Sequence, residues 1–309
     1  MTVLGVDAGG TKTQAFVADE KERILGESLS GPGNHQTSGI ETATDSIRQA
    51  VEGAIAAAGL SPGQIDRAVL GISGADRKED FDILIPVVKE ILLEIPFKVI
   101  NDAWLGLRLA SERFAGIVSV CGTGAAHAGR STDGKEYILR NLDYATGNKG
   151  GGDELVLDAL HYAFRSSEGT WEKSRLEEAI PEVFGVKDLD AVCDIVFNGK
   201  MTKEQRYRIP VTVFSLAREN DPVSVFLIRK MGTEMGRYAA AVIERLKFYD
   251  EKVPATLIGS LFKTEEPLLI NSYMEVVRQT APGIYPVIPK EAPALGAVRL
   301  ALDKETVPG

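Results

Sequence analysis

The sequence of 309 residues is longer than one ordinary domain, and its 44% hydrophobic content can build the cores of two domains of roughly 120 to 190 residues. The formal net charge of −9 argues against DNA or RNA as the main partner, because affinity for a phosphate backbone comes from clustered Lys and Arg. The N-terminus has no basic region with a long apolar core, and no apolar run approaches ~18 residues, so we expect a cytoplasmic protein with no membrane partner.

Three short strands are predicted at the start of the chain, and the same pattern returns further on. An offset of 114 residues places residues 6–25 on residues 120–139 without a gap, with seven of the twenty positions identical. The pattern of each segment predicts an apolar strand, a glycine-bearing turn, a second strand, a charged turn and a third strand. We interpret this as a duplication, with chance matching of a biased composition as the alternative.

The first glycine-bearing turn, Asp7 to Thr13, is a candidate phosphate-binding loop. It follows an apolar strand, and Gly9 and Gly10 permit a tight turn whose amide hydrogens can face an anion closely. The spacing of its glycines differs from the spacing in a Walker A loop and in a dinucleotide-binding loop. The carboxylate of Asp7 is suited to organise hydrated Mg²⁺. Taken alone, the two glycines are explained equally well by a structural hairpin.

Helices and strands alternate beyond the first three strands. The pattern predicts a helix over residues 40–58, a strand over 68–73, a helix over 78–93, a strand over 97–101 and a helix from Asp102. Such alternation is typical of a mostly parallel α/β sheet that helices cover on both faces.

Asn101 and Asp102 lie where the strand at 97–101 passes into a helix. This is the strand end at which open α/β sheets bind ligands. A carboxylate there can accept the proton of an attacking hydroxyl during phosphoryl transfer. An Asp at the same junction is also a common N-cap, and without further context capping is the stronger interpretation.

The second half of the sequence repeats this order with more helices. It begins with a strand at Ile117 and continues with several helices over about residues 153–248. Strands are predicted at 255–260 and 285–289, and a closing helix from Ala292.

These elements predict two domains with a hinge near Ala115 and Gly116. The first domain would comprise residues 1–115 together with 292–309, and the second residues 116–291 with a helical insertion.

A second glycine turn, residues 121–124, occupies the equivalent place in the second copy. Two such turns at matching positions predict loops that face each other across a pseudo-twofold cleft and hold a triphosphate from both sides. Two unrelated hairpins are the alternative.

Two further glycine segments lie in the second half. Asp153 follows a run of three glycines that ends at Gly152 and opens an apolar helix, so it is a candidate for ligand contact or an acidic residue at a positive helix end. Gly259 and Ser260 end an apolar strand, where the backbone could lie against a base or ribose.

The histidines and cysteines show no metal-ligand spacing. His127 and His161 are interpreted as structural or surface residues, while His35 lies in the Gly31–His35 loop, whose polar tip could hydrogen-bond a substrate. Two cysteines are too few for a disulfide framework and fit a reducing compartment. Cys193 is expected to fill an apolar helix face.

Seven short motifs together resemble the BadF/BadG/BcrA/BcrD ATPase family in order and approximate spacing: DAGGTKT, GISGADR, INDAW, CGTG, GGGDE, IGS and ALGA. Within it, the chain looks most like the N-acetylglucosamine kinase branch of the actin-like (ASKHA) superfamily. The resemblance covers almost the whole chain. It implies duplicated ribonuclease H-like domains, each a mixed five-stranded sheet flanked by helices, with a cleft between them.

The resemblance also implies roles for individual residues. Those that would bind ATP are Asp7, Gly9, Gly10, Thr11, Lys12, Thr13, Gly122, Thr123, Gly124, Gly259 and Ser260. Those that would bind the sugar are Asn34, His35, Asn101, Asp102, Gly152 and Asp153, with Asp102 as the catalytic base. Mg²⁺ would be held by Asp7 through water, and the family suggests a homodimer.

The implied activity is transfer of the terminal phosphate of ATP to a hydroxyl of a small sugar, such as N-acetylglucosamine. The kinases typically continue Gly-Asp-Glu with Gly-Ser and carry a tryptophan upstream, whereas here Leu155 and Val156 follow and Tyr144 is the nearest aromatic residue. Cys121 replaces the serine that is usual before Gly-Thr-Gly. Glucosamine, N-acetylmuramic acid and other polyols therefore stay open as acceptors.

Two other functions are compatible with the same resemblance. One is an activator of a 2-hydroxyacyl-CoA dehydratase or benzoyl-CoA reductase, which couples ATP hydrolysis to electron transfer from an iron–sulfur cluster shared by a dimer. That role needs two suitably placed thiolates in each subunit. The cysteine count permits it, but Cys121 abuts the phosphate loop and Cys193 lies in no matching motif. The other is a non-catalytic nucleotide sensor, against which Asp102 is the main argument.

Overall fold

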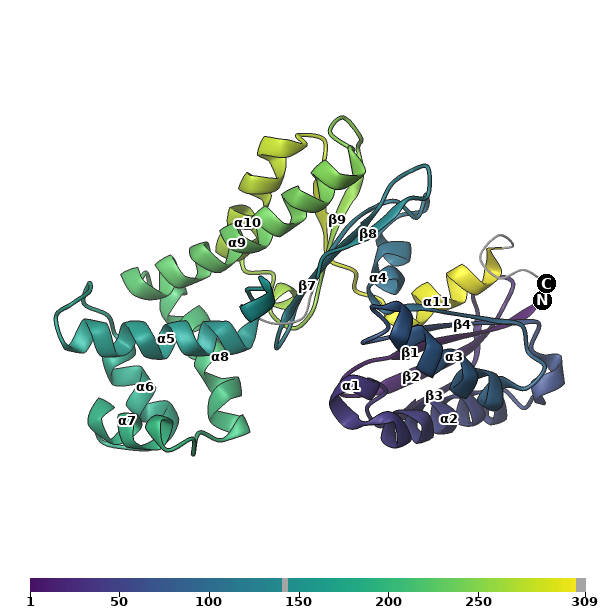
Figure 1. The fold of residues 1–309 in the computed structure, drawn as a ribbon, viewed down its shortest axis with the longest axis horizontal. Coiled ribbons are helices and arrows are strands. Elements are labelled where there is room, and N and C mark those ends of the chain that lie inside the picture. Colours follow the sequence, from purple (N-terminus) through teal and green to yellow (C-terminus); the bar gives the residue numbers. More distant parts are fainter. Residues whose placement is uncertain (141–143, 304–309) are drawn as a thin grey trace. The chain divides into compact units, whose positions relative to one another are not determined.

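The computed structural model describes residues 1–140 and 144–303, which form two compact units. The first unit comprises Met1–Val118, Thr132–Gly134 and the segment from Pro289, and the second Ser119–Ser131 and Lys135–Ile288. The predicted segment 292–309 is thus described only to residue 303. Figure 1 labels the elements of each unit.

The first unit is built on a five-stranded mixed sheet in the order β3-β2-β1-β4-β5. The first three strands are antiparallel, and β1, β4 and β5 run parallel. The carboxyl ends of β1, β4 and β5 therefore meet at one edge of the sheet. The strands are β1 (Thr2–Ala8), β2 (Thr13–Asp19), β3 (Ile24–Ser30), β4 (Arg67–Ile72) and β5 (Phe97–Asn101).

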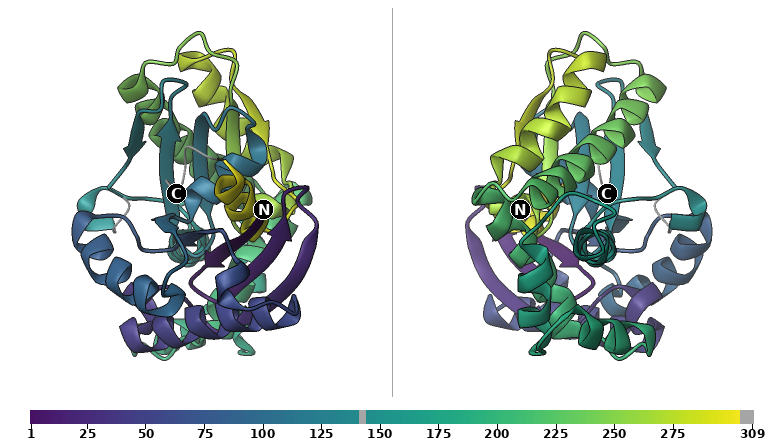
Figure 2. Two further views of the ribbon diagram at one scale, coloured as in Figure 1. Left: turned by 90° about the vertical axis from the view of Figure 1, so that its right-hand side faces the viewer. Right: turned by 90° about the vertical axis from the view of Figure 1, so that its left-hand side faces the viewer.

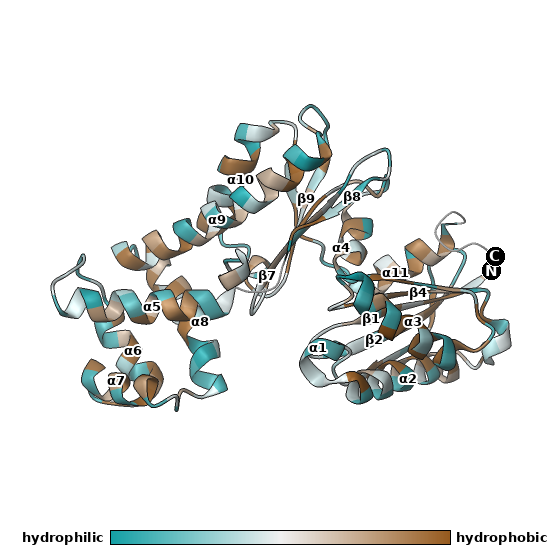
Figure 3. Cartoon of the chain, in the orientation of Figure 1, coloured by the Kyte–Doolittle hydropathy of each residue, from teal (hydrophilic) through white to brown (hydrophobic). Residues whose placement is uncertain are grey.

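Helices cover both faces of this sheet. Successive side chains of a strand point to opposite faces of the sheet, so the unit has a hydrophobic core on each face. One core includes Leu4 and Leu70 of the sheet with Ile47 of α2. The other includes Val3 and Val69 with Val298 of α11. Along α2, hydrophobic and hydrophilic residues alternate as in an amphipathic helix (Figure 3). The helices of this unit are α1 (His35–Ser38), α2 (Ile40–Ala57), the 3-10 helix η1 (Pro62–Gln64), α3 (Lys78–Leu92), α4 (Ala103–Ala110) and α11 (Pro293–Leu302).

The closing helix α11 packs closely on α4 and the sheet because glycines stand at the contacts. A Cβ at Gly296 would lie 2.2 Å from the carbonyl oxygen of Leu105, and one at Gly5 would lie 2.5 Å from the amide nitrogen of Val298. Gly296 is therefore a position at which α11 and α4 pack too closely for a larger residue.

The second unit is built on a second five-stranded sheet in the order β10-β9-β6-β7-β8. Its strands are β6 (Gly116–Cys121), β7 (Ala125–Arg130), β8 (Glu136–Ile138), β9 (Pro254–Ile258) and β10 (Tyr285–Val287). Read from its other edge, this order matches that of the first sheet strand for strand, which supports the duplication. The predicted fold class is confirmed.

Most helices of the second unit lie between β8 and β9 in the chain, as predicted. The long helix α9 lies side by side with α10 (Figure 2). The helices are η2 (Tyr144–Thr146), α5 (Gly152–Ser167), α6 (Leu176–Phe184), α7 (Leu189–Phe197), α8 (Lys203–Arg218), α9 (Pro222–Leu246), η3 (Phe262–Thr264) and α10 (Pro267–Thr280). Within the described ranges, no helix combines the length and the hydrophobicity that are needed to span a lipid bilayer.

Candidate functional site

The first phosphate-loop candidate is the turn between β1 and β2. The amide of Gly9 donates to the carbonyl oxygen of Lys12 at 2.9 Å, and a Cβ at Gly10 would meet nothing within 4 Å. Residues 10–12 are exposed, whereas Thr13 is buried and its hydroxyl has no hydrogen-bond partner among the described residues. This tight, open turn leaves its tip accessible, as an anion-binding loop requires.

The loop that carries Asn34 is fixed against this turn. The amide of Gly33 donates to the carbonyl oxygen of Gly9 at 2.8 Å. A Cβ at Gly33 would lie 2.6 Å from the Thr13 hydroxyl and 2.7 Å from the Cβ of Ala8, so only glycine allows the two loops to approach so closely. The first unit thereby brings a predicted sugar-binding residue next to the predicted phosphate loop.

Asn34 is buried and its side chain makes two defined hydrogen bonds. Its oxygen accepts from the amide of Gln36 at 2.8 Å, so it caps the short helix α1. Its amide nitrogen donates to the Ser73 hydroxyl at 3.2 Å, just beyond the end of β4. The hydrogen bonds hold the side chain in one orientation at the carboxyl edge of the sheet.

His35 contacts an acidic residue. Its Nε2 lies 3.2 Å from a carboxylate oxygen of Asp80, to which Gln36 also donates at 3.1 Å. Hydrogen bonds from Arg77 and Gln36 hold the pKa of Asp80 at about 2, although burial opposes them. Asp80 is therefore ionised at neutral pH and fixes the His35 ring.

Asp102 stands at the end of β5, as predicted. Burial, and then the charge of Asp76, raise the pKa of its carboxyl to about 6. Asp102 occupies the N-cap position of α4 but makes no side-chain capping hydrogen bond into the helix. The amide of Ala103 donates instead to the side-chain oxygen of Asn101 at 2.9 Å. Asp102 is thus the N-cap residue of α4 by position, whereas the side-chain hydrogen bond to the Ala103 amide is made by Asn101, and the role of Asp102 as a base stays a prediction.

Ser73, Asp76 and Asp80 belong to this group of residues but were missed by the sequence analysis. They follow β4, whose carboxyl end adjoins those of β1 and β5. The sequence did contain a signal for them. Open α/β sheets bind ligands at the carboxyl ends of their strands, and this rule, which singled out Asp102 after β5, applies equally to the residues after β4.

The second phosphate-loop candidate is the turn between β6 and β7. The glycine run before α5 packs against this turn. The amide of Gly152 donates to the carbonyl oxygen of Gly122 at 2.8 Å, and that of Asp153 to the carbonyl oxygen of Thr123 at 2.9 Å. At Gly151, φ is +88° and a Cβ would lie 2.5 Å from the carbonyl carbon of Gly124. The two predicted segments therefore form one structure in the second unit.

Gly259 and Ser260 adjoin the same turn. A Cβ at Gly259, where φ is +103°, would lie 2.3 Å from the carbonyl oxygen of Cys121. That oxygen also accepts from the amide of Leu261 at 3.0 Å. The predicted adenosine-side motif and the second phosphate loop are therefore neighbours at the ends of β9 and β6.

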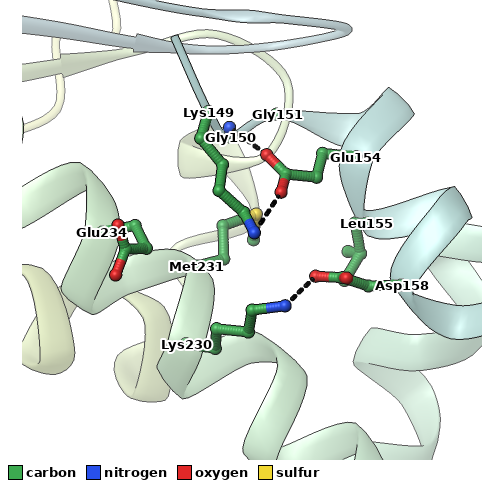
Figure 4. Close-up of a pocket in the computed structure, with 9 residues that line it drawn as sticks. All are labelled: Lys149, Gly150, Gly151, Glu154, Leu155, Asp158, Lys230, Met231 and Glu234. Atoms are coloured by element: carbon green, nitrogen blue, oxygen red, sulfur yellow. Dashed lines mark hydrogen bonds and ion pairs between the residues drawn. The ribbon is translucent and has the colours of Figure 1, made fainter. Parts of the chain in front are cut away.

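The acidic residues that open α5 have different surroundings. The Asp153 side chain is 58% exposed and lies 3.9 Å from Arg206, so it is open to a ligand. Glu154 instead accepts from the amide of Gly150 and pairs with Lys149 at 2.7 Å. Figure 4 shows this pair beside a second one, Lys230 with Asp158, in a small pocket behind the glycine run. Glu154 thus holds the loop, while Asp153 is accessible.

The remaining histidines and the cysteines have structural or surface positions. His127 is buried and burial lowers its pKa to about 3, and His161 is exposed on α5, as expected. Cys121 is buried, and burial raises the pKa of its thiol to about 12. Cys193 is exposed, so the expectation that it fills an apolar helix face is wrong. The nine-residue helix α7 buries only the stripe of Leu189 and Val192.

The predicted site residues thus fall into two local groups. In the first unit, residues 7–13, Asn34, His35, Asn101 and Asp102 lie around the carboxyl edge of the sheet. In the second unit, residues 122–124, Gly152, Asp153, Gly259 and Ser260 surround one turn.

Known proteins are similar to this chain in sequence and fold. A sequence model of the BadF/BadG/BcrA/BcrD ATPase family matches residues 4–301. The chain is 25% identical over 299 residues to the N-acetylmuramic acid/N-acetylglucosamine kinase of Clostridium acetobutylicum, with 97% of both chains covered. It is 22% identical to the N-acetyl-D-glucosamine kinase of Dictyostelium discoideum, with 98% of both covered.

A solved structure is also similar to this chain. A candidate N-acetylglucosamine kinase from Chromobacterium violaceum superposes with a TM-score of 0.70 and 25% identity, over 98% of this chain and 99% of that one. The family match extends over nearly the whole chain, including both groups of site residues. This protein therefore belongs to the BadF/BadG/BcrA/BcrD ATPase family.

Proposed function

We propose that this protein is an ATP-dependent kinase that phosphorylates a hydroxyl of an amino sugar such as N-acetylglucosamine. The observation that carries the proposal is the position of Asp102: its carboxyl, with a pKa of about 6, stands at the carboxyl end of β5, in the unit where the Asn34 loop is bound to the first phosphate loop. The named activities of the relatives from Clostridium acetobutylicum and Dictyostelium discoideum support it.

Asp102 is the proposed general base. The attacking sugar hydroxyl gives its proton to the Asp102 carboxylate, its oxygen forms a bond to the γ-phosphorus of ATP, and the bond from that phosphorus to ADP breaks. A carboxyl with a pKa near 6 is ionised at neutral pH, yet is a stronger base than an ordinary Asp. Asn34, His35, Gly152 and Asp153 are the proposed sugar-binding residues, whereas the buried Asn101 side chain is committed to Asp76 and the Ala103 amide.

The glycine loops are the proposed binding elements for ATP. Residues 7–13 and 122–124 would bind phosphate oxygens through backbone amides, with Gly259 and Ser260 beside the adenosine. The chain's negative net charge fits binding by backbone amides better than binding by clustered Lys and Arg.

Mg²⁺ is proposed as the cofactor. Among the described residues, no three His, Cys, Asp or Glu side chains gather in a way that could hold a metal ion. Mg²⁺ is usually bound by substrate phosphates, water and one or two carboxylates. Asp7, at the end of β1, is the carboxylate that would hold it through water. When bound, the ion neutralises charge on the transferring phosphate.

An iron–sulfur activator is disfavoured by the cysteines. A cluster shared between two subunits needs two accessible thiolates from each. Cys121 is buried and its thiol has a pKa of about 12, which leaves Cys193 as the accessible cysteine.

The proposed kinase is a cytoplasmic homodimer with two domains, residues 1–115 with 292–309 and residues 116–291, and its partner is the small-molecule sugar.

The two thiols should react very differently. We expect the native protein at pH 8 to react with one equivalent of 5,5′-dithiobis(2-nitrobenzoic acid) and the unfolded protein with two, because only Cys193 is exposed and a thiolate is the reactive form. Absorbance at 412 nm measures the released thiolate. Cys193→Ser should remove the native reaction, and fast reaction of two thiols in the native wild type would contradict the structure.

The proposed function is tested by ADP release in the presence of Mg²⁺ and a panel of sugars. We expect release to require a sugar and to be fastest with N-acetylglucosamine, N-acetylmuramic acid or glucosamine. Glucose and a non-sugar polyol serve as comparison acceptors. Rapid ATP hydrolysis without any sugar, or no response to any member of the panel, would reject the kinase.

A further inference from the structure

The carboxylate of Asp80 joins the proposed sugar-binding loop, residues 34–36, to the start of α3. Asp80 is buried and accepts hydrogen bonds from two directions. On the α3 side, the backbone amide of Arg77 donates to one carboxylate oxygen at 2.9 Å, and the Arg77 guanidinium donates at 3.3 Å. On the loop side, the side-chain nitrogen of Gln36 donates to the other oxygen at 3.1 Å, and Nε2 of His35 lies 3.2 Å from it. One buried carboxylate thus serves both a helix end and two residues next to Asn34.

The same carboxylate decides which nitrogen of the His35 ring carries the proton. An ionised carboxylate only accepts hydrogen bonds, and the pKa of Asp80 is about 2, so Nε2 of His35 must be the donor. The other ring nitrogen, Nδ1, is buried and has no hydrogen-bond partner among the described residues. A neutral ring with its proton on Nε2 leaves a lone pair at Nδ1 rather than an unpaired N–H. Asp80 therefore holds His35 in the Nε2–H tautomer.

Gln36 connects Asp80 to Asn34. Its side-chain nitrogen also donates to the carbonyl oxygen of Gly74 at 3.0 Å, so both of its amide protons are used. Its backbone amide donates to the side-chain oxygen of Asn34 at 2.8 Å. A Cβ at Gly74, where φ is +85°, would lie 2.9 Å from that Asn34 oxygen and 3.1 Å from Cδ of Gln36. The side chains of Asn34 and Gln36 are therefore packed closely on the backbone of Gly74.

We propose that Asp80 is the positioning residue of the proposed sugar-binding loop, where it fixes the tautomer of His35 and, through Gln36, the orientation of Asn34. This inference rests on the proposed function, in which Asn34 and His35 bind the sugar. Because Asp80 is buried, it acts through these side chains and not by contact with the sugar.

Asp80→Asn should change this arrangement in a defined way, because an amide has one oxygen and one NH2 group in place of two oxygens. The backbone amide of Arg77 can only donate, so the remaining oxygen is expected to stay on it. The NH2 group then faces Gln36 and His35, which are both donors in the wild type. His35 can adapt by carrying its proton on Nδ1, whereas Gln36 can turn only by losing its hydrogen bond to Gly74. The variant should therefore switch the tautomer of His35 and loosen Gln36.

The tautomer of His35 is measured in the full chain, labelled with ¹⁵N at its three histidines, by long-range ¹H–¹⁵N correlation at pH 8. The His35 signals are identified by their loss in His35→Gln. We expect the Nε2–H pattern in the wild type and the Nδ1–H pattern in Asp80→Asn. Asp82→Asn is the matched control and should keep the wild-type pattern, because it makes the same change at an exposed residue of α3 that pairs with Lys78. The same His35 pattern in the wild type and in Asp80→Asn would overturn the proposal.

Steady-state kinetics with N-acetylglucosamine give the second readout. Asp80→Asn should raise KM for the sugar about tenfold, because the proposed sugar-binding loop loses hydrogen bonds that orient it for ground-state binding. Asp82→Asn should leave KM unchanged. A role of Asp80 in stability alone would lower the melting temperature and leave KM of the folded enzyme unchanged, and that result would also overturn the proposal.

Gly74→Ala tests the same loop with Asp80 left in place. The new Cβ must displace the side chains of Asn34 and Gln36, so KM for the sugar should rise in this variant too. Gly59→Ala is its control, since φ is +69° there and a Cβ would meet nothing within 4 Å. An unchanged KM in Gly74→Ala would contradict the connection from Gln36 to Asn34. If the wild type shows no sugar-dependent ADP release, the proposed function fails, whereas the tautomer measurement still decides whether Asp80 controls His35.

Discussion

Asp102→Ala is expected to lower kcat for sugar-dependent ADP release by about 10²- to 10⁴-fold, because the attacking hydroxyl loses its proton acceptor. ATP affinity should stay within about twofold of the wild type, since a base acts on the chemical step more than on ground-state binding. Steady-state kinetics with saturating sugar measure the first quantity, and calorimetric titration with ATP measures the second.

The matched control for this variant is Asp82→Ala, which removes an exposed aspartate that pairs with Lys78 on the surface of α3. It should retain near-normal turnover. If Asp102→Ala also turns over at a near-normal rate, Asp102 is not the base. The wild-type rate should also fall as the pH decreases through about 6, where Asp102 becomes protonated.

Gly151→Ala is expected to weaken ATP binding by about tenfold or more, because no methyl group fits between the glycine run and the second phosphate loop. The new Cβ would lie 2.5 Å from the Gly124 carbonyl carbon, and φ is +88° at this position. Backbone must therefore move at the turn proposed to bind phosphate. Titration with ATP, together with the melting temperature, separates lost binding from lost folding.

Gly147→Ala is the matched control. Its φ is +91°, but a Cβ there would meet nothing within 4 Å, so it shares the backbone strain without the clash. If both variants lose ATP affinity equally, the close contact with Gly124 is not responsible. Normal ATP affinity in Gly151→Ala would show that the second turn does not depend on this contact.

Local patterns were sufficient to predict most elements of the fold. The helix at residues 40–58 and the strand at 97–101 were predicted almost at their observed bounds, because amphipathic periodicity and flanking turn residues are encoded in neighbouring positions. The duplicated order of strands was also detectable, since glycines and charged turns recur at matching positions.

Contacts between distant segments were harder to predict. That Gly151 packs on Gly124, and Gly259 on Cys121, depends on how the strands and helices fold back on one another. Likewise, Asp76 lies beside Asn101 because β4 and β5 are parallel neighbours. Strand-end rules identify residues that can lie at one edge, but they do not say which hydrogen bonds those residues make.

The arrangement of α11 constrains when the first unit can be completed during synthesis. This helix packs against α4, the helix that begins directly after Asp102, through a contact that requires Gly296. Yet the whole second unit separates α4 from α11 in the chain. On the ribosome, the helix that follows the proposed base can therefore be covered by α11 only after the second unit has been synthesised. A nascent chain that ends before α11 would leave an apolar surface open to chaperones.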